Sequence, residues 1–234
     1  MIKPLFLLLV ALLSCMLPTL GTSQHPLWIR YPAISPNGQT IAFSYKGDIY
    51  TVSISGGLAK QLTTHPGYDS HPIWSPDGKQ IAFQSDREGS QDIYIMPALG
   101  GTPSQLTFQS GSEIPCCFSP DGESVYFTAS NGFDKEYGQF PFPNMQQLYR
   151  VPAKGGRIER IISLPVNNVS VNQTDNLFLY HDYKGYEDAW RKHHTSSIAR
   201  DIWIYNKKER KTRKLSSFKG ENREPVFSPD EQDV

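Results

Sequence analysis

The sequence has no excess of charge of either sign. Its 234 residues include 23 Lys and Arg against 23 Asp and Glu, which gives a formal net charge of zero. Proteins that bind nucleic acid or an anionic membrane through electrostatics carry basic patches, and a balanced composition gives no reason to expect one. We therefore expect no nucleic-acid partner, and no membrane contact apart from a lipid anchor that Cys15 could carry.

Cysteine is also scarce, because the chain has only Cys15, Cys116 and Cys117. Neighbouring residues of a strand point to opposite faces, so Cys116 and Cys117 could form a disulfide bond only by distorting the backbone. The C-x-x-C spacing of a redox pair is missing as well. We expect two free thiols, one buried and one partly exposed.

The common catalytic signatures are missing too. The sequence contains no G-x-S-x-G elbow, no H-E-x-x-H helix and no phosphate-binding or dinucleotide fingerprint. His193 and His194 are adjacent, and adjacent histidines seldom both reach one ion, so their grouping with His181 and Asp182 does not predict a zinc site. We expect no catalytic residue, no cofactor and no metal site in this chain.

The long apolar run is confined to the N-terminus. Leu5 to Leu13 follows Lys3 and precedes small or polar residues up to Ser23, which is the order of a secretory signal peptide. The run is short for a membrane span. We expect a signal peptide at 1–23, a mature region at 24–234, and export to the bacterial periplasm or outer envelope. A lipoprotein box that ends at Cys15 is the alternative.

What the sequence does contain is a repeat. The segment 73–83 centres on Ser-Pro-Asp-Gly at 75–78, and the pattern recurs at 35–38 and 119–122 and begins again at 228–231. Pro presets φ for the first central turn position, and Gly takes a left-handed conformation. The flanking residues alternate between apolar and polar, as half-buried strands do. Each copy therefore predicts two β-strands joined by a tight turn.

Two further motifs extend each copy to four strands. Asp-Ile-Tyr or a variant starts a third strand, and Gln-Leu-Thr or a variant ends a fourth, with the same internal spacing in all four units. In the fourth unit, 172–175 replaces the Ser-Pro turn. Repeats of four antiparallel strands predict an all-β fold, a β-propeller of four complete blades plus the start of a fifth. We expect it to be part of a six- or seven-bladed propeller.

The motif series resembles the propeller repeat of the TolB and tricorn type. A more specific resemblance lies in Lys184-Gly185-Tyr186 and its continuation through Trp190 to Ser197, which is similar to a loop of tricorn proteases, particularly the exported bacterial ones. The resemblance implies the N-terminal propeller region of a large serine peptidase that degrades peptides. The catalytic domain of that family would lie outside this chain.

The connection between the second and third strands is lengthened at 130–146 and 181–200. Both insertions would emerge on one face, and insertions on one face of a repeat protein usually mark its binding face. Aromatic residues and Arg dominate binding hot spots. The candidate substrate-binding residues are Tyr183, Lys184, Tyr186, Trp190, Arg191, His193 and His194. The alternative is that the second insertion packs onto its own blade.

The sequence thus leads to a hypothesis of function. The chain would be the propeller part of an exported tricorn-like serine peptidase that selects or guides peptide substrates to a distant catalytic domain. Expected partners are a peptide or unfolded protein, the remaining blades and peptidase domain of the same protein, and a second copy through unpaired strand edges. The alternative is a non-catalytic periplasmic TolB-like propeller that binds a protein partner.

Overall fold

The computed structural model describes residues 28–109, 111–130, 145–185 and 197–234. These residues contain sixteen β-strands and no helix, so no helix in the described ranges is long and apolar enough to cross a membrane. The strands are β1 Arg30–Ile34, β2 Thr40–Tyr45, β3 Asp48–Ser53, β4 Lys60–Gln61, β5 Asp69–Trp74, β6 Gln80–Ser85, β7 Asp92–Pro97, β8 Ser104–Gln105, β9 Glu113–Phe118, β10 Ser124–Ser130, β11 Gln146–Pro152, β12 Glu159–Ile162, β13 Val166–Val171, β14 Leu177–Asp182, β15 Ile202–Asn206 and β16 Lys211–Lys214.

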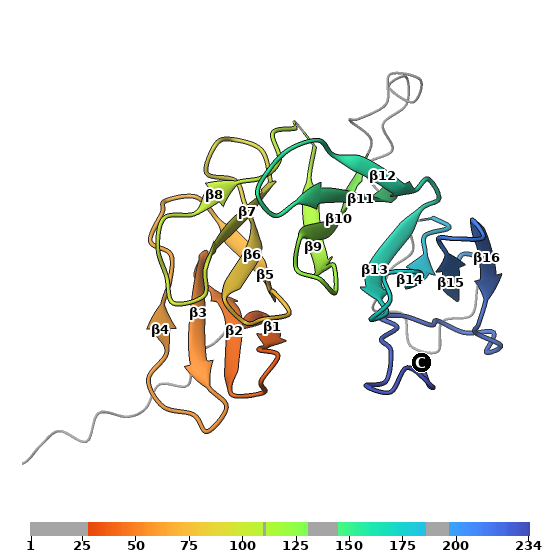
Figure 1. The fold of residues 1–234 in the computed structure, drawn as a ribbon, viewed down its shortest axis with the longest axis horizontal. Coiled ribbons are helices and arrows are strands. Elements are labelled where there is room, and N and C mark those ends of the chain that lie inside the picture. The colour runs from red at the N-terminus through yellow and green to blue at the C-terminus, as the bar shows by residue number, and fades with distance from the viewer. Residues whose placement is uncertain (1–27, 110, 131–144, 186–196) are drawn as a thin grey trace, which may run out of the picture.

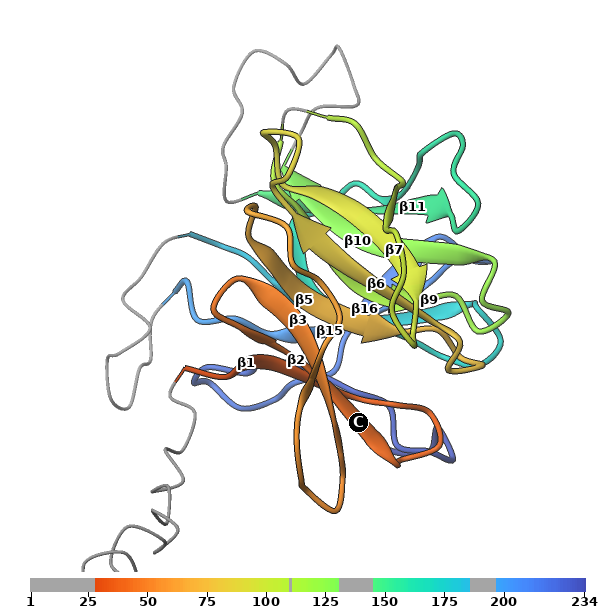
Figure 2. The same ribbon diagram turned by 90° about the vertical axis from the view of Figure 1, so that its left-hand side faces the viewer.

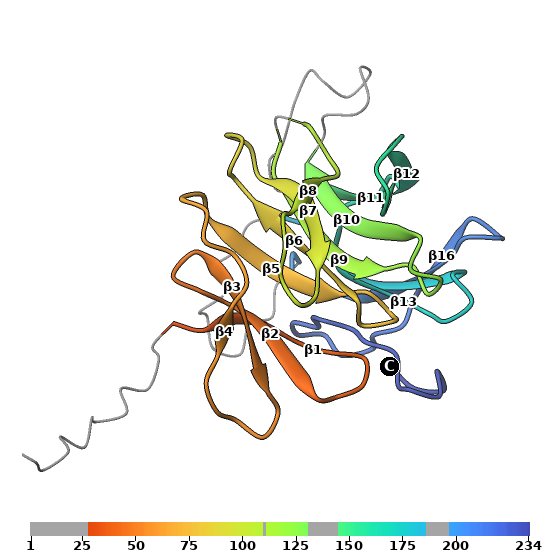
Figure 3. The ribbon, with the colours of Figure 1, turned by 60° about the vertical axis from the view of Figure 1, so that its left-hand side comes forward.

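The strands form four antiparallel sheets of four strands, each in chain order. We call them blade 1 (β1–β4), blade 2 (β5–β8), blade 3 (β9–β12) and blade 4 (β13–β16). The blades stand side by side in an open arc, with β1, β5, β9 and β13 nearest its centre and β4, β8, β12 and β16 outside (Figure 1). Figure 3 shows the twisted sheets following one another obliquely. The prediction of a propeller of four-stranded blades is confirmed, in an arc that is not closed.

The Ser-Pro turns form as the sequence predicts. In blade 2 the Ser75 hydroxyl donates to Asp77 (2.7 Å) and accepts from the N–H of Gln80 (2.9 Å), while Gly78 has φ 71°. The turns at 35–38 and 119–122 repeat this arrangement. The turns of these three blades lie together on the right in Figure 2. Each turn sets the register of the hairpin between the first two strands of its blade.

The other two motifs of the repeat bond to each other. In blade 1 the carboxylate of Asp48, which starts β3, accepts from Gln61 (2.9 Å) and from Thr63 (3.1 Å). The hydroxyl of Thr63 also accepts from the N–H of Ile49 (2.9 Å). In blade 4, Ser216 bonds Asp201 and Ile202 in the same way. The two motifs therefore recur together because they fasten the fourth strand to the third.

The hydrophobic core lies between blades. A single blade exposes both faces, so each face must be covered by a neighbour. Ile81 and Phe83 are buried between blades 1 and 2, Val125 and Phe127 between blades 2 and 3, and Phe178 and Tyr180 between blades 3 and 4. Alternate residues of the second strand of each blade thus pack against the blade before it and the blade after it. Because both faces are buried, the second strands are continuous apolar runs.

The start of a fifth blade forms its turn. Ser228 donates to Asp230 (2.6 Å), and Glu231 takes the place of glycine with φ 58°. The N–H of Glu224 donates to the buried His181 (3.2 Å), which holds this segment against blade 4. In the described part of the segment 217–234, however, no strand is formed.

One expectation about the cysteines is wrong. Pairing of β9 with β10 places Cys117 opposite Tyr126 and Pro115 opposite Phe127, which leaves Cys116 as the extra residue of a β-bulge. A bulge interrupts the alternation of side chains along a strand. Both cysteines are therefore partly exposed and line one cavity, instead of lying on opposite faces. The expectation of two free thiols is confirmed.

Candidate functional site

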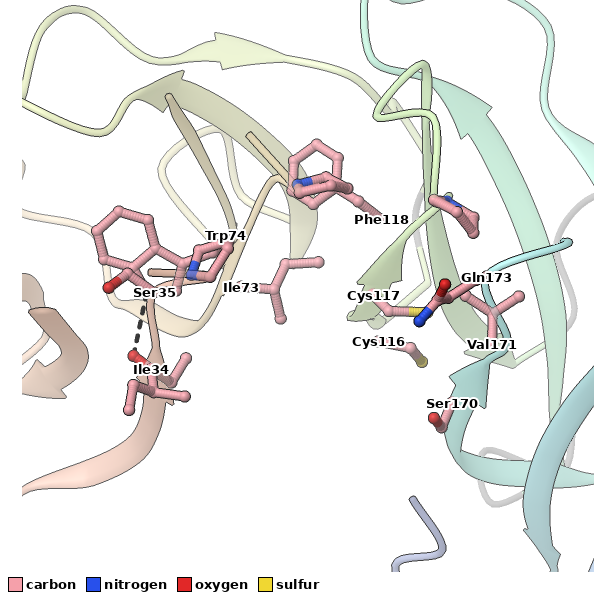
Figure 4. A pocket seen from close by; sticks show the side chains of 14 residues that line it. Ile34, Ser35, Ile73, Trp74, Cys116, Cys117, Phe118, Ser170, Val171 and Gln173 are labelled. Carbon is pink, nitrogen blue, oxygen red and sulfur yellow. Dashed lines mark hydrogen bonds between the residues drawn. The ribbon is translucent and has the colours of Figure 1, made fainter. Parts of the chain in front are cut away.

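The innermost strands of the four blades line the concave side of the open arc (Figure 1). We call this space, which is open on one side, the channel. Near the Ser-Pro turns it holds a cavity of about 550 Å³, lined by residues of β1, β5, β9 and β13 (Figure 4). A second cavity of about 500 Å³ lies toward the opposite end, where Thr128 and Gln146 flank the first insertion. Glu224, Pro225 and Val226 also line it, so the start of the fifth blade contributes to the channel wall.

Each inner strand is interrupted by a register shift at the same height. In three blades and in the fifth segment, the residue at this point has a left-handed backbone, which is uncommon outside glycine and often marks a functional region. These residues are Tyr31 (φ 51°), His71 (φ 52°), Asn168 (φ 49°) and Glu224 (φ 55°). Blade 3 has Pro115 there, and proline cannot adopt a positive φ. The inner strands of the open arc therefore carry a row of bulges at one height, which we call the ring of bulges.

Blades 1 and 2 meet in this ring through an aromatic stack. The rings of Tyr31 and His71 lie 3.6 Å apart, and the Nδ1 atom of His71 is 3.1 Å from the hydroxyl of Ser70. Burial lowers the pKa of His71 to about 4, so the imidazole is neutral at pH 7. At this level blades 1 and 2 contribute an uncharged, flat surface, and the fifth segment contributes Glu224 to the same cavity wall as His71.

Blades 2 and 3 each place a carboxylate at the start of the inner strand. Asp69 is fully buried and accepts from Nη2 of Arg87 at 2.9 Å to both carboxylate oxygens. Glu113 is fully buried as well, but its Oε2 atom bonds the hydroxyl of Thr107, and within the described ranges its Oε1 atom has no hydrogen-bond partner. Burial, with a further contribution from Asp92, raises the pKa of Glu113 to about 8.

The structure places Lys184 at the base of the second insertion. Its Nζ atom donates to Asp201 (2.6 Å) and to the carbonyl of Ala199 (2.8 Å), and lies 3.5 Å from Asp182. Burial alone would lower the pKa of Lys184, but the hydrogen bond to Asp201 and the charge of Asp182 raise it. These contacts fasten the insertion to blade 4, as Arg87 fastens the corresponding loop of blade 2.

The remaining candidates of the sequence analysis are less well placed. The ring of Tyr183 receives the guanidinium of Arg200 at 5.6 Å from its centroid. Tyr186, Trp190, Arg191, His193 and His194 lie outside the described residues. The ring of bulges was missed by sequence reasoning. Its signal was present in Tyr31-Pro32, His71-Pro72 and Glu224-Pro225, which recur at one distance before the Ser-Pro turn.

In the part of the chain that the structure describes, no three His, Cys, Asp or Glu side chains lie close enough together to hold one metal ion.

A comparison with known families decides the identity of the fold. The model of the tricorn protease N-terminal beta propeller domain matches residues 26–232. The chain belongs to this family. The match includes all four blades and the start of the fifth.

Individual relatives of this tricorn-family propeller are much longer. The chain is 32% identical over 73 residues to tricorn protease homolog 1 of Streptomyces coelicolor, a match that covers 30% of the chain and 7% of the relative. The chain therefore spans a small part of that protein.

Two solved structures share the architecture. A tricorn protease crystal structure is 20% identical with a TM-score of 0.67, over 87% of this chain and 20% of that one. TolB from Acinetobacter baumannii is 21% identical with a TM-score of 0.62, over 88% of this chain and 47% of that one. At about 20% identity, the similarity to these two structures shows a shared fold.

Proposed function

We propose that this propeller selects and guides peptide substrates to the serine peptidase domain of a larger protein. The family supports the proposal, because the model that matches the chain is that of a protease's N-terminal propeller. The remaining blades and the peptidase domain of the same protein would be its partners, with a second copy of the chain joining through unpaired strand edges.

The observation that carries the proposal is the channel. Its two cavities, of about 550 and 500 Å³, lie between inner strands of different blades and reach the level at which the insertions begin. The wall there is formed by bulged backbone, uncharged rings and small side chains such as Ser170. A wall of this kind fits an extended peptide of varied sequence, because contacts with backbone and flat rings place few demands on side chains.

The test is to narrow the channel in the whole protein. Ser170 lines both cavities of the channel, so Ser170→Trp would fill part of each, and we expect kcat/KM to fall at least about tenfold for a long peptide, which is about 1.4 kcal/mol. A short chromogenic substrate, which can reach the catalytic domain by another route, should be hydrolysed normally. Leu58→Trp is the matched control, because Leu58 is 98% exposed. Unchanged turnover of the long peptide in Ser170→Trp would contradict the proposal.

The insertions have a separate test. Deleting 131–144 and 186–196 from the whole protein should reduce hydrolysis of long peptides, if Tyr186, Trp190, Arg191, His193 and His194 contact substrate. If the second insertion only packs onto its own blade, the deletion would lower stability and leave peptide selection as it was. Lys184 is retained in this design, so that its bonds to Asp201 and Ala199 still close the base of the loop.

A second function is supported by the similar likeness to TolB, whose TM-score of 0.62 is close to that of the protease. In this alternative the propeller binds a protein partner and takes no part in catalysis. A pull-down from an envelope extract that yields one stoichiometric partner would favour it, provided that Ser170→Trp leaves peptide hydrolysis unchanged.

Export is part of the same proposal. Expression in a bacterium with N-terminal sequencing of the product should give Gln24 as the first residue, if 1–23 is a signal peptide. A lipoprotein would instead begin at Cys15 and incorporate labelled fatty acid. Recovery of an intact Met1 from the cytoplasm would contradict both routes.

A further inference from the structure

The two thiols of blade 3 form an unusual feature of the channel. At the two positions of the inner strand that Cys116 and Cys117 occupy, blade 1 has Pro32 and Ala33 and blade 2 has Pro72 and Ile73. None of the corresponding side chains can bind a metal ion. The pair is therefore a departure from the repeat, at the level where the strand faces the cavity of about 550 Å³.

The bulge brings both sulfur atoms to one side of the strand. Cys116 is the extra residue of the bulge, so the alternation that would separate the side chains of neighbours is lost. Both side chains pack against the core between blades 3 and 4, and both line the cavity with Ser170 and Gln173. Cys116 lines the second cavity as well, and its thiol donates to the carbonyl of Ile114 at 3.7 Å. Figure 4 shows both sulfur atoms directed toward these residues of blade 4.

A disulfide bond is the less suitable product of this arrangement. The Cα atoms of adjacent residues are about 3.8 Å apart across a trans peptide. Ordinary disulfides need about 4.4 to 6.8 Å between Cα atoms. Both cysteines are free in the structure. Two thiols on one side of a strand that do not bridge each other can still bind one atom between them.

We propose that Cys116 and Cys117 form a two-coordinate site for a thiophilic ion of the Cu(I) class in the wall of the channel. On binding, the two thiol protons are released and two S–Cu bonds form, with no change of oxidation state. Thiolates select soft ions such as Cu(I). Structural Zn²⁺ sites need four ligands, and among the described residues no group of three His, Cys, Asp or Glu side chains is placed to share one ion.

The surroundings disfavour the thiolate forms of both residues. Burial raises the pKa of Cys116 to about 11 and holds the pKa of Cys117 well above its ordinary value, although hydrogen bonds with the backbone of Val169 and Val171 act against it. The charged side chain that faces Cys117 is Asp175, which is itself paired with Lys207 at 2.8 Å. An ion that binds both sulfur atoms must therefore displace two protons.

The experiment uses the full chain with Cys15→Ser, so that the pair provides its two thiols. The first probe is phenylarsine oxide, whose arsenic forms two As–S bonds while its oxygen leaves as water with both thiol protons. We expect one arsenical per chain by native mass spectrometry. The second probe is Cu(I) itself, in competition with bathocuproine disulfonate, and we expect one ion per chain.

Cys116→Ser and Cys117→Ser are matched variants, because each keeps one thiol and both bulge positions. Each should lose the arsenical adduct and weaken Cu(I) binding at least about 100-fold, while reaction with N-ethylmaleimide still labels the remaining thiol. Two results would overturn the proposal. They are undiminished Cu(I) binding in either variant and arsenical labelling without Cu(I) binding. Circular dichroism checks that each variant is folded.

Discussion

Blades 2 and 3 have the same architecture and differ in how they treat equivalent positions of the inner strand. At the first residue of this strand, both carboxylate oxygens of Asp69 accept from Arg87 in blade 2. The carboxyl group of Glu113 in blade 3 bonds the hydroxyl of Thr107 and has no ion pair among the described residues. Two positions further on, blade 2 has His71 with φ 52°, and blade 3 has Pro115. The repeat thus conserves shape, while charge and backbone strain vary from blade to blade.

The difference follows from the loop that comes after the second strand. In blade 2 this loop carries Arg87, whose guanidinium lies 4.7 Å from the ring centroid of Tyr94 and 5.4 Å from that of Phe83. In the sequence, the position that corresponds to Arg87 is Asn131 in blade 3 and Lys184 in blade 4. A buried carboxylate that lacks a cation is held protonated by its surroundings instead, as the raised pKa of Glu113 indicates.

The largest effect is expected from breaking the pair in blade 2. Arg87→Met leaves the fully buried Asp69 without its cation, and we expect a loss of about 3 to 5 kcal/mol in the free energy of unfolding. Urea-induced unfolding followed by tryptophan fluorescence measures it. Lys79→Met is the control, because its pair with Asp77 is mostly exposed and is screened by solvent, so that its loss should change the free energy of unfolding little. Equal losses in the two variants would show that the buried Asp69–Arg87 pair contributes no more to stability than the exposed pair.

The second prediction exchanges the bulge residue. His71→Pro gives blade 2 the residue of blade 3, but proline cannot adopt a positive φ, and the stack on Tyr31 is lost. We expect a destabilisation of about 2 to 3 kcal/mol in the same unfolding experiment. Pro115→Ala in blade 3 is the matched change and should cost less than about 1 kcal/mol. A well-tolerated His71→Pro would mean that the left-handed bulge is not required.

The third prediction concerns pH. The folded-state pKa of Glu113 is raised to about 8, so between its ordinary value and pH 8 the folded state holds a proton that the unfolded state has released. Stability therefore falls as the pH rises, by about 1 to 2 kcal/mol between pH 6.5 and 8. Glu113→Gln should remove this slope, whereas Asp69→Asn, which loses the pair with Arg87, should leave it. Parallel pH profiles of wild type and Glu113→Gln would refute the assignment.

The smallest effect is expected from removing the hydroxyl groups of Thr107 and Thr63, which occupy the same position in blades 2 and 1. Thr107→Val removes the hydrogen-bond partner of the buried Glu113, while Thr63→Val leaves Asp48 still bonded to Gln61. We expect a loss of about 1 kcal/mol for the first and about half of that for the second. Thermal unfolding at pH 6.5 compares them under conditions in which Glu113 is protonated. A larger loss for Thr63→Val would show that these threonine hydroxyls stabilise the fold mainly by accepting from the N–H groups of Ile49 and Ile93 in the third strand, and not by bonding the carboxyl groups.

The sequence by itself determined the blades. The Ser-Pro turns, the motif that starts the third strand and the motif that ends the fourth are local patterns, and local turn chemistry and side-chain alternation act through neighbouring residues. The substitute turn at 172–175 was found the same way, and it forms with Asp175 at φ 53°. These elements could be predicted because each depends on a few consecutive residues.

Only the tertiary structure decided the rest. The pairing of Asp69 with Arg87, the isolation of Glu113 and the common side of Cys116 and Cys117 depend on contacts across the sheet and on the bulge. The expectation for the cysteines was wrong because it assumed that side chains alternate between the two faces along the whole strand. The bulge adds one residue to the strand and interrupts that alternation. The channel wall is assembled from residues separated by whole blades, and such contacts exist only once the blades have packed against one another.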